Sequence, residues 1–358
     1  MLAKRFVQIF TGIIFIFFLI NVVLWHGVVS KIFFSKNDHG DLSRLGSFDT
    51  TEAVTKQVRY NTKHVEFEEY LRSGVSEHFD IITIGDSFSN GKGGAYYQDY
   101  LTEQYGKTVL NVKTGSYSAV QMLHLLDDLG YLDEIKPKTV ILESVERNMQ
   151  DYFGNVEANT LSTSREAFMK SQLIGNKTEI DAITAEGKLL PSIMVDANMN
   201  FIENRIFALC HLGKLSDLVY ITQLNRDEFT NLGQENMLLF LNDDLWYLKK
   251  QTNYKTINEN LNMAADVLAK KKINMIFITA VDKYDLYYPY IKDHQGQQEN
   301  LFFVEFEKLP KNYTFINTKQ ILRSLLADGE KDVYWSDDTH WSWKAQQVIV
   351  NEVDKNIN

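Results

Sequence analysis

Short β-branched runs alternate with longer amphipathic stretches along much of the chain. Strand-like runs cover residues 79–84 (FDIITI), 108–113 (TVLNVK), 138–146 (KTVILESVE), 273–281 (INMIFITAV) and 313–318 (YTFINT). Helix-like stretches cover residues 94–105, 117–129, 256–271 and 342–356. Because strands that alternate with helices are typical of βαβ units, the pattern predicts an α/β fold with a parallel sheet.

A polar, Asn-rich stretch with scattered aromatic residues interrupts this alternation at about residues 150–245. The strand and helix pattern resumes after it, so we interpret the stretch as an insertion or cap on one domain rather than as a separate domain.

The amino terminus carries a long apolar run. Between Arg5 and His26 about twenty residues are interrupted only by Gln8, Thr11 and Asn21, which is the length that an α-helix needs to cross a bilayer. The run is too long for a cleaved signal peptide, and no small-x-small cleavage site follows it. The pattern predicts an uncleaved transmembrane anchor in residues 1–30, followed by a membrane-proximal linker in residues 31–77.

Charges next to the apolar run predict its orientation. Lys4 and Arg5 precede it and Trp25 closes it, an arrangement that favours a cytoplasmic amino terminus. We therefore expect a single-pass protein of the cell membrane whose domain, residues 78–358, lies outside the cytoplasm, in the periplasm or at the cell surface.

Composition narrows the classes of protein. With 44% hydrophobic and 23% charged residues, the 358-residue chain resembles an ordinary globular protein. Its net charge of −10, with no Lys/Arg cluster and no glycine-rich phosphate loop, argues against binding of nucleic acid. Cys210 is the only cysteine, which excludes an internal disulfide and a cysteine-based metal site.

Two stretches carry candidate chemistry. The stretch ITIGDSFSNG places Ser87 directly after a predicted strand, where open α/β sheets bind their ligands. The stretch VYWSDDTHWSW, residues 333–343, places His340 two and three residues after Asp338 and Asp337. A general base needs such a carboxylate to orient its imidazole toward a nucleophile. Strand-exit turns and helix caps also use these residue types.

Together the two stretches resemble the SGNH (GDSL-type) esterase and acyltransferase superfamily. The block DTHW is similar to that of SGNH domains of the alginate O-acetyltransferase type, as are VILESVERN (140–148) and VDKYDLYYPYI (281–291). The resemblance covers about residues 78–358 and implies a flavodoxin-like, three-layer α/β/α domain.

The chain also departs from these relatives. Its Asp-x-His block follows the serine, as in ordinary SGNH esterases, whereas it precedes the serine in the alginate enzymes. The usual Gly-x-Asn-Asp block is missing after the third strand, where SVERN stands.

The resemblance implies a serine acyl-enzyme. No metal-ligand set is visible in the sequence, and no cofactor is expected. Ser87 is the expected nucleophile, His340 the base and Asp338 its orienting acid, while the spacing of ordinary SGNH esterases selects Asp337 instead. The backbone N–H groups of Ser87 and Gly115 would bind the oxyanion, and Asn148 or Arg147 would assist.

Further residues are assigned by position. Lys283 and Tyr284 are candidates to line the pocket. We expect Asp86 to stabilise the turn, and Glu143 and Glu146 to form a buried ion pair with Arg147.

Two activities fit these residues. One is O-acyl transfer, with acetyl as the expected acyl group, to a cell-envelope or exported polysaccharide, with a membrane-bound O-acyltransferase as the acyl donor. The other is an extracytoplasmic carbohydrate esterase, which would use the same residues with water as acceptor. A non-catalytic binding module of an export complex is the third interpretation.

Overall fold

The computed structural model describes most of the chain. It covers residues 2–34, 40–51, 53, 63–73, 78–90, 96–115, 117–155, 163–174, 191–209, 213–249, 251–294 and 296–357.

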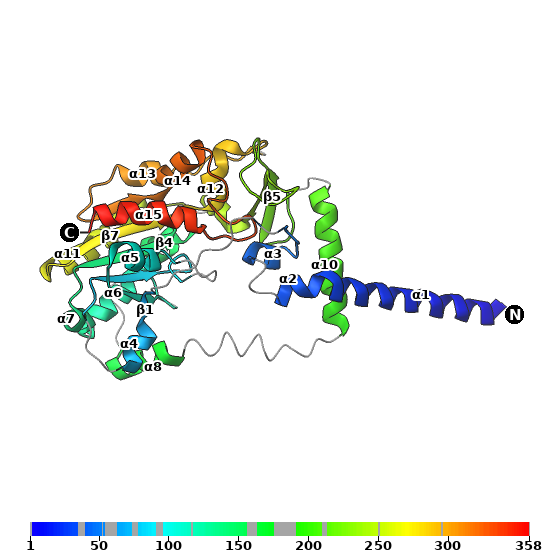
Figure 1. The fold of residues 1–358 in the computed structure, drawn as a ribbon, viewed down its shortest axis with the longest axis horizontal. Coiled ribbons are helices and arrows are strands. Elements are labelled where there is room, and N and C mark those ends of the chain that lie inside the picture. The colour runs from blue at the N-terminus through cyan, green and yellow to red at the C-terminus, as the bar shows by residue number, and fades with distance from the viewer. Residues whose placement is uncertain are drawn as a thin grey trace.

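A six-stranded parallel sheet forms the centre of the domain (Figure 1). Its strands, in spatial order, are β1 (Val65–Glu66), β3 (Val109–Lys113), β2 (Ile81–Gly85), β4 (Thr139–Val145), β7 (Asn274–Ala280) and β8 (Thr314–Asn317). All five predicted strands are present, which confirms the α/β fold. The two central strands β2 and β4 are buried along their whole length, as expected for a sheet that is covered on both faces.

Helices cover the two faces of the sheet. Those that pack together on one face are α5 (Tyr97–Tyr105), α14 (Thr318–Ala327) and α15 (Trp343–Lys355). Those that pack on the other face are α6 (Ala119–Asp128), α7 (Tyr131–Ile135), α11 (Tyr254–Lys270) and α13 (Phe302–Glu307). In α11 the buried Ile257, Leu261, Ala264 and Leu268 recur every three or four residues, which is the spacing of one apolar helix face.

The strand order produces a topological switch point. The chain moves from β2 to β3 in one direction and then returns past β2 to β4. Loops that follow adjacent strands therefore diverge at the carboxyl ends of β2 and β4, and this is where ligands bind in open α/β sheets. Ser87 follows β2 and Arg147 follows β4.

The stretch predicted as an insertion holds a second, antiparallel pair of strands. These are β5 (Val219–Gln223) and β6 (Met237–Leu241). The described residues of this stretch also form η3 (Gln150–Gly154), α8 (Arg165–Ile174) and α10 (Pro191–Leu209), with η4 (Asn242–Leu248) after them.

The amino-terminal segment is helical and extends away from the domain (Figure 1). Helix α1 (Leu2–Leu24) continues into η1 (Trp25–Val29) and α2 (Ser30–Phe34). Residues Ala3–Ile32 are long and apolar enough to cross a membrane, and the most apolar part of the segment is almost wholly exposed, whereas Trp25, Val29 and Ile32 near its end are buried. It is therefore not a core helix of the domain.

Parts of the stretch 31–77 belong to the folded domain, which corrects its prediction as a linker. Helix α3 (Asp41–Leu45) contacts the loop of His340, and β1 pairs with β3 at the edge of the sheet. Helix α4 (Phe67–Ser73) follows, and Phe67 is part of the main core. A two-residue edge strand is too short to be distinguished by its sequence pattern.

Candidate active site

The turn after β2 presents Ser87 to solvent. Ser87 is exposed, whereas its neighbours Phe88 and Ser89 are buried. Asp86 holds the turn together, because its carboxylate accepts hydrogen bonds from the backbone N–H groups of Phe88 (3.1 Å) and Val145 (2.8 Å). Asp86 thus ties the turn to the end of β4 and acts as a turn carboxylate, as expected.

Gly85 is required by a close approach of side chains. A Cβ atom at this position would lie 2.2 Å from Oγ of Ser89 and 2.5 Å from Oε2 of Glu143. These two groups are hydrogen-bonded to each other, with Ser89 Oγ donating to Glu143 Oε2 at 2.7 Å. Ser89 is therefore engaged in the core, and Ser87 is the serine of this turn that is open to a substrate.

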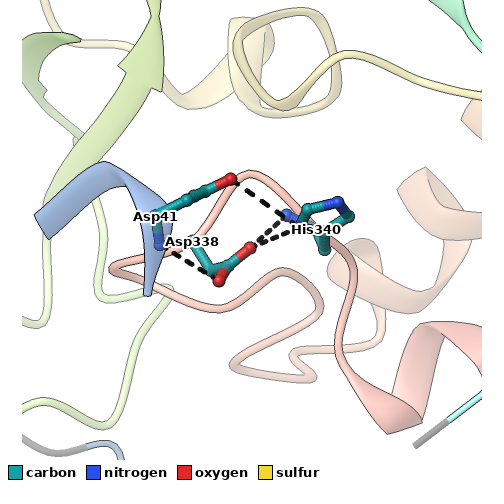
Figure 2. Close-up of side chains that lie close together, drawn as sticks. All are labelled: Asp41, Asp338 and His340. Carbon is teal, nitrogen blue, oxygen red and sulfur yellow. Dashed lines mark hydrogen bonds and ion pairs between the residues drawn. The ribbon is translucent and has the colours of Figure 1, made fainter. Parts of the chain in front are cut away.

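The loop before α15 places His340 beside a carboxylate (Figure 2). Nδ1 of His340 lies 2.5 Å from Oδ1 of Asp338, and the same oxygen accepts the backbone N–H of His340 at 3.0 Å. Asp337 contacts a different group, since its Oδ2 accepts the backbone N–H of Gly40 at 2.8 Å. Of the two candidate acids, Asp338 is the one in contact with the imidazole.

A residue far away in sequence completes this arrangement. Asp41 in α3 accepts hydrogen bonds from the backbone N–H (2.7 Å) and the hydroxyl (2.5 Å) of Thr339. Its own N–H donates to Oδ2 of Asp338 at 3.2 Å, and its Oδ2 lies 3.8 Å from Nδ1 of His340. Sequence reasoning missed Asp41, because nothing in its local pattern connects it to residues near the carboxyl terminus.

The charges of this cluster shift the pKa values of its members. Burial alone would lower the pKa of His340, but the negative charges of Asp338 and Asp41 outweigh it and raise this pKa above its usual value. Burial would raise the pKa of Asp338, but His340 holds it well below its usual range. Burial and the nearby Asp338 raise the pKa of Asp41.

Asp41, Asp338 and His340 also present ligand atoms within 4.8 Å of one another, a spacing that a cation could bridge. The hydrogen bonds among these side chains and Thr339 already account for the arrangement. Asp338 and His340 therefore form a hydrogen-bonded acid and base pair, and Asp41 lies beside it.

Lys283 stabilises the loop of His340 from inside the protein. It is buried in α12 (Lys283–Tyr287), and its Nζ donates to the carbonyl oxygens of Trp335 (2.6 Å), Ser336 (3.0 Å) and Asp338 (3.0 Å). Burial lowers the pKa of Lys283 to about 8, although nearby carboxylates oppose this shift. The ammonium group holds together the loop that carries Asp338 and does not line a pocket.

Arg147 lies near the site and is paired with carboxylates. Its NH1 atom lies 2.8 Å from Oδ1 of Asp282 and 3.4 Å from Oδ1 of Asp244. Its guanidinium carbon lies 5.9 Å from the centre of the Phe88 ring. Burial would lower the pKa of Arg147, but these two carboxylates raise it above its usual value.

This pairing corrects the predicted ion pair between Arg147 and two glutamates. Glu143 accepts the hydrogen bond of Ser89, and burial and Asp86 raise its pKa well above the usual range. Glu146 accepts hydrogen bonds from the backbone N–H of Asp282 (2.9 Å) and the side chain of Asn300 (2.6 Å). The partners of Arg147 follow other strands, so local sequence spacing could not reveal them.

The remaining candidates lie at the same edge of the sheet or behind it. Gly115 follows β3, is exposed and has φ +61°, a left-handed conformation that favours glycine. Asn148 is half-buried in η2 (Glu146–Asn148). Tyr284 is buried, and its backbone N–H donates to Asp244 at 3.2 Å. Tyr284 therefore packs behind the site and does not face an open pocket.

The serine turn and the histidine loop meet through Phe88. Its ring packs against the imidazole of His340, with centroids 4.8 Å apart. Nε2 of His340 is buried and makes no hydrogen bond to any described residue. The structure thus brings the two loops into contact without a hydrogen bond from Ser87 to His340. Hydrogen bonds between a nucleophile and its base are often long or poorly aligned in structures without substrate.

Comparisons with known proteins give distant structural likenesses only. No protein-family model matches the chain, and no curated protein matches it. A mutant of an acetyl-xylooligosaccharide esterase from Geobacillus stearmophilus has a TM-score of 0.36 and 10% identity, covering 79% of this chain and 96% of that one. A protein from Parabacteroides merdae, described as a GDSL-like lipase, has a TM-score of 0.31 and 10% identity, covering 78% and 98%.

A third solved structure is from Bacteroides fragilis and is described as an acylhydrolase. It has a TM-score of 0.28 and 8% identity, and it covers 79% of this chain and 86% of that one. Likenesses at this level carry no argument about activity, which must rest on the residues of this chain.

Proposed function

We propose that this protein is a membrane-anchored, SGNH-type serine enzyme that transfers acyl groups to a cell-envelope or exported polysaccharide outside the cytoplasm. The observation that carries the proposal is the hydrogen-bonded pair Asp338 and His340, in contact through Phe88 with the turn that presents Ser87. A serine acyl-enzyme needs a nucleophile, a base and an orienting acid in this relation.

In this mechanism Nε2 of His340 takes the proton of the Ser87 hydroxyl, and Oγ of Ser87 attacks the acyl carbonyl carbon of the donor. Asp338 holds the other ring nitrogen and stabilises the imidazolium that forms. His340 then gives this proton to the leaving group of the donor. In the second step His340 takes the proton of the acceptor hydroxyl, whose oxygen attacks the acyl-enzyme, and returns it to the oxygen of Ser87 as the acyl group leaves. The tetrahedral oxyanion would accept hydrogen bonds from the backbone N–H groups of Ser87 and Gly115.

The side chains after β4 supply further candidates for this step. Arg147 is a fixed cation at the switch point of the sheet, and Asn148 follows it. Either side chain would stabilise negative charge on the acyl group.

The anchor supports transfer near a membrane. The end of α1 is attached to the folded domain, because Asn198 in α10 donates a hydrogen bond to the backbone oxygen of Asn21 at 2.9 Å. Loss of residues 1–30 would remove this contact, which favours an anchor that is retained. An anchored site lies within reach of an acyl donor in the bilayer, and we propose a membrane-bound O-acyltransferase as that donor.

Hydrolysis is the second candidate activity, and the exposure of Ser87 favours it. Water reaches an exposed acyl-enzyme unless an acceptor excludes it. The test supplies the full chain in nanodiscs with a chromogenic acetyl ester, with and without envelope oligosaccharide, and measures both acetate and acetylated sugar by mass spectrometry. Transfer predicts acetylated sugar at the expense of acetate. Acetate release that no acceptor changes, with removal of acetyl groups from a natural polysaccharide, would identify an esterase.

Topology is tested separately. A reporter enzyme fused after Asn358 should be active only outside the cytoplasm, and cytoplasmic activity would contradict both candidate functions.

A further inference from the structure

Helix α10 exposes an apolar stripe beside the candidate membrane helix. Met199, Ile202 and Ile206 are 52%, 39% and 51% exposed. At 3.6 residues per turn these side chains fall within about 60° of arc around the helix axis. They form one continuous face, and contiguous exposed apolar surface marks a surface that binds a partner or a membrane.

The opposite face of α10 is attached to the domain. The side chain of Asn204 donates a hydrogen bond to the backbone oxygen of Gly46. Arg205, which lies about 60° around the helix from Ile202 and so borders the stripe, donates to the backbone oxygen of Asp49 at 2.9 Å and lies over the ring of Phe48. Asn204 is about 140° to 200° around the helix from each residue of the stripe. The stripe therefore points away from the domain.

Helix α10 is also attached to the end of the apolar helix. Nδ2 of Asn198 donates to the backbone oxygen of Asn21 (2.9 Å) and to its Oδ1 (3.0 Å). Phe201 packs in a small apolar cluster with Trp25, Val29 and Ile32. Figure 1 shows α10 running crosswise to α1 at the end that meets the domain. If α1 crosses a bilayer along its normal, α10 is set roughly parallel to the bilayer plane.

The position of this attachment along α1 indicates what the apolar stripe contacts. Twenty helical residues from Arg5 span about 30 Å, the thickness of the hydrocarbon core. Trp25 therefore lies at the membrane interface, where tryptophan is enriched. Helix α10 packs on α1 at this level, and its opposite face is attached to the domain outside the membrane. The stripe points away from the domain and therefore toward the surface of the same bilayer.

We propose that α10 is an interfacial helix that inserts Met199, Ile202 and Ile206 into the bilayer that α1 crosses. This proposal rests on the anchoring role of α1 in the proposed function. Two fixed points, one spanning and one lying on the membrane, hold the domain in one orientation toward a membrane donor. Asp196 and Glu203 border the stripe, so binding rests on apolar burial and does not require anionic lipid.

Spin-label accessibility tests the proposal on the full chain in zwitterionic nanodiscs. A Cys210→Ser background carries single labels at Ile202→Cys and Ile206→Cys, with Leu301→Cys as a solvent control and Ile13→Cys as a lipid control. Leu301 is a matched control because it is an apolar residue of the domain that is 54% exposed. The ratio of oxygen to nickel-chelate accessibility should be several-fold higher on α10 than at Leu301.

The other outcomes are distinct. Labels on α10 that match Leu301, while Ile13 reports lipid, would overturn the interfacial helix and leave the anchor intact. Aqueous labels at both α10 and Ile13 would overturn the anchor and the inference together. Labels on α10 that neither reagent reaches, with spectra broadened by the label of a neighbouring copy, would show that a second copy of the chain covers the stripe. This outcome also overturns the inference.

A second measurement avoids the change at Cys210. In nanodiscs, amide hydrogen exchange in residues 195–207 should be slower in the wild-type chain than in the triple variant Met199→Gln, Ile202→Gln and Ile206→Gln. The matched triple variant Met263→Gln, Leu301→Gln and Val304→Gln, at residues that are 45%, 54% and 49% exposed, should leave exchange in α10 unchanged. Equal exchange in the wild type and the first triple variant would contradict the inference, whatever the catalytic activity.

Discussion

The ring of Phe88 lies against the imidazole of His340, with the two ring centres 4.8 Å apart. Phe88 directly follows Ser87, so this contact joins the turn after β2 to the loop before α15. Arg147 lies on the same phenyl ring, 5.9 Å from its centre. The contact joins the two loops, and Ser87 itself is exposed to solvent.

Ser87→Ala should abolish covalent labelling by a fluorophosphonate probe, because the exposed hydroxyl is the proposed nucleophile. Ser89→Ala is the matched control, since Ser89 is buried and bonded to Glu143; labelling should persist in this variant if it folds. Labelled peptides identified by mass spectrometry decide the assignment. A label on any other serine, or one that survives in Ser87→Ala, would refute it.

Asp338→Asn should lower turnover by about three to four orders of magnitude, because the neutral amide no longer stabilises the imidazolium of His340. Asp337→Asn should retain most of the activity, since Asp337 bonds the backbone of Gly40 and not the imidazole. Initial rates with a chromogenic ester measure both. The reverse order of effects would make Asp337 the orienting acid.

Asp41→Asn should move the acid limb of the pH profile of kcat/KM to lower pH by about half to one unit. The negative charge of Asp41, 3.8 Å from His340, helps to raise the pKa of the imidazole. Removal of that charge lowers this pKa, so the neutral base persists to lower pH. The amide oxygen can still accept the N–H of Thr339, which limits structural damage. An unchanged acid limb would show that Asp41 acts on the loop without influencing the base.

Lys283→Met should lower kcat by about 10- to 100-fold, because the loop that carries His340 is displaced. It should also lower the free energy of unfolding by about 2–4 kcal/mol. The variant leaves the carbonyl oxygens of Trp335, Ser336 and Asp338 without their shared donor.

Lys319→Met is the control for Lys283→Met. It removes another buried lysine, whose partners among the described residues are Asp285 at 2.7 Å, Glu299 at 2.9 Å and the backbone oxygen of Asn300 at 3.1 Å. The thermal midpoint should fall in both variants, whereas kcat should fall strongly only in Lys283→Met. Equal losses of kcat would indicate a general effect of stability and not a role of Lys283 in positioning the loop.

Local sequence determined the strands, most of the helices around them and the two loops of the candidate site. Short β-branched apolar runs such as FDIITI favour buried central strands, and the β2 exit with Gly85 and Ser87 is a local pattern. The apolar run before Trp25 is equally local, since its length and composition alone make it a candidate membrane helix.

The tertiary structure decided which carboxylates act on which groups. Asp337 and Asp338 are equivalent in local sequence, but the backbone N–H of Gly40, just before α3, bonds Asp337, whereas Oδ1 of Asp338 is in contact with His340. Asp41 joins them across almost the whole chain. Hydrogen bonds and charge effects depend on distances of a few ångströms, and chain topology sets these distances between segments whose separation in sequence carries no such information.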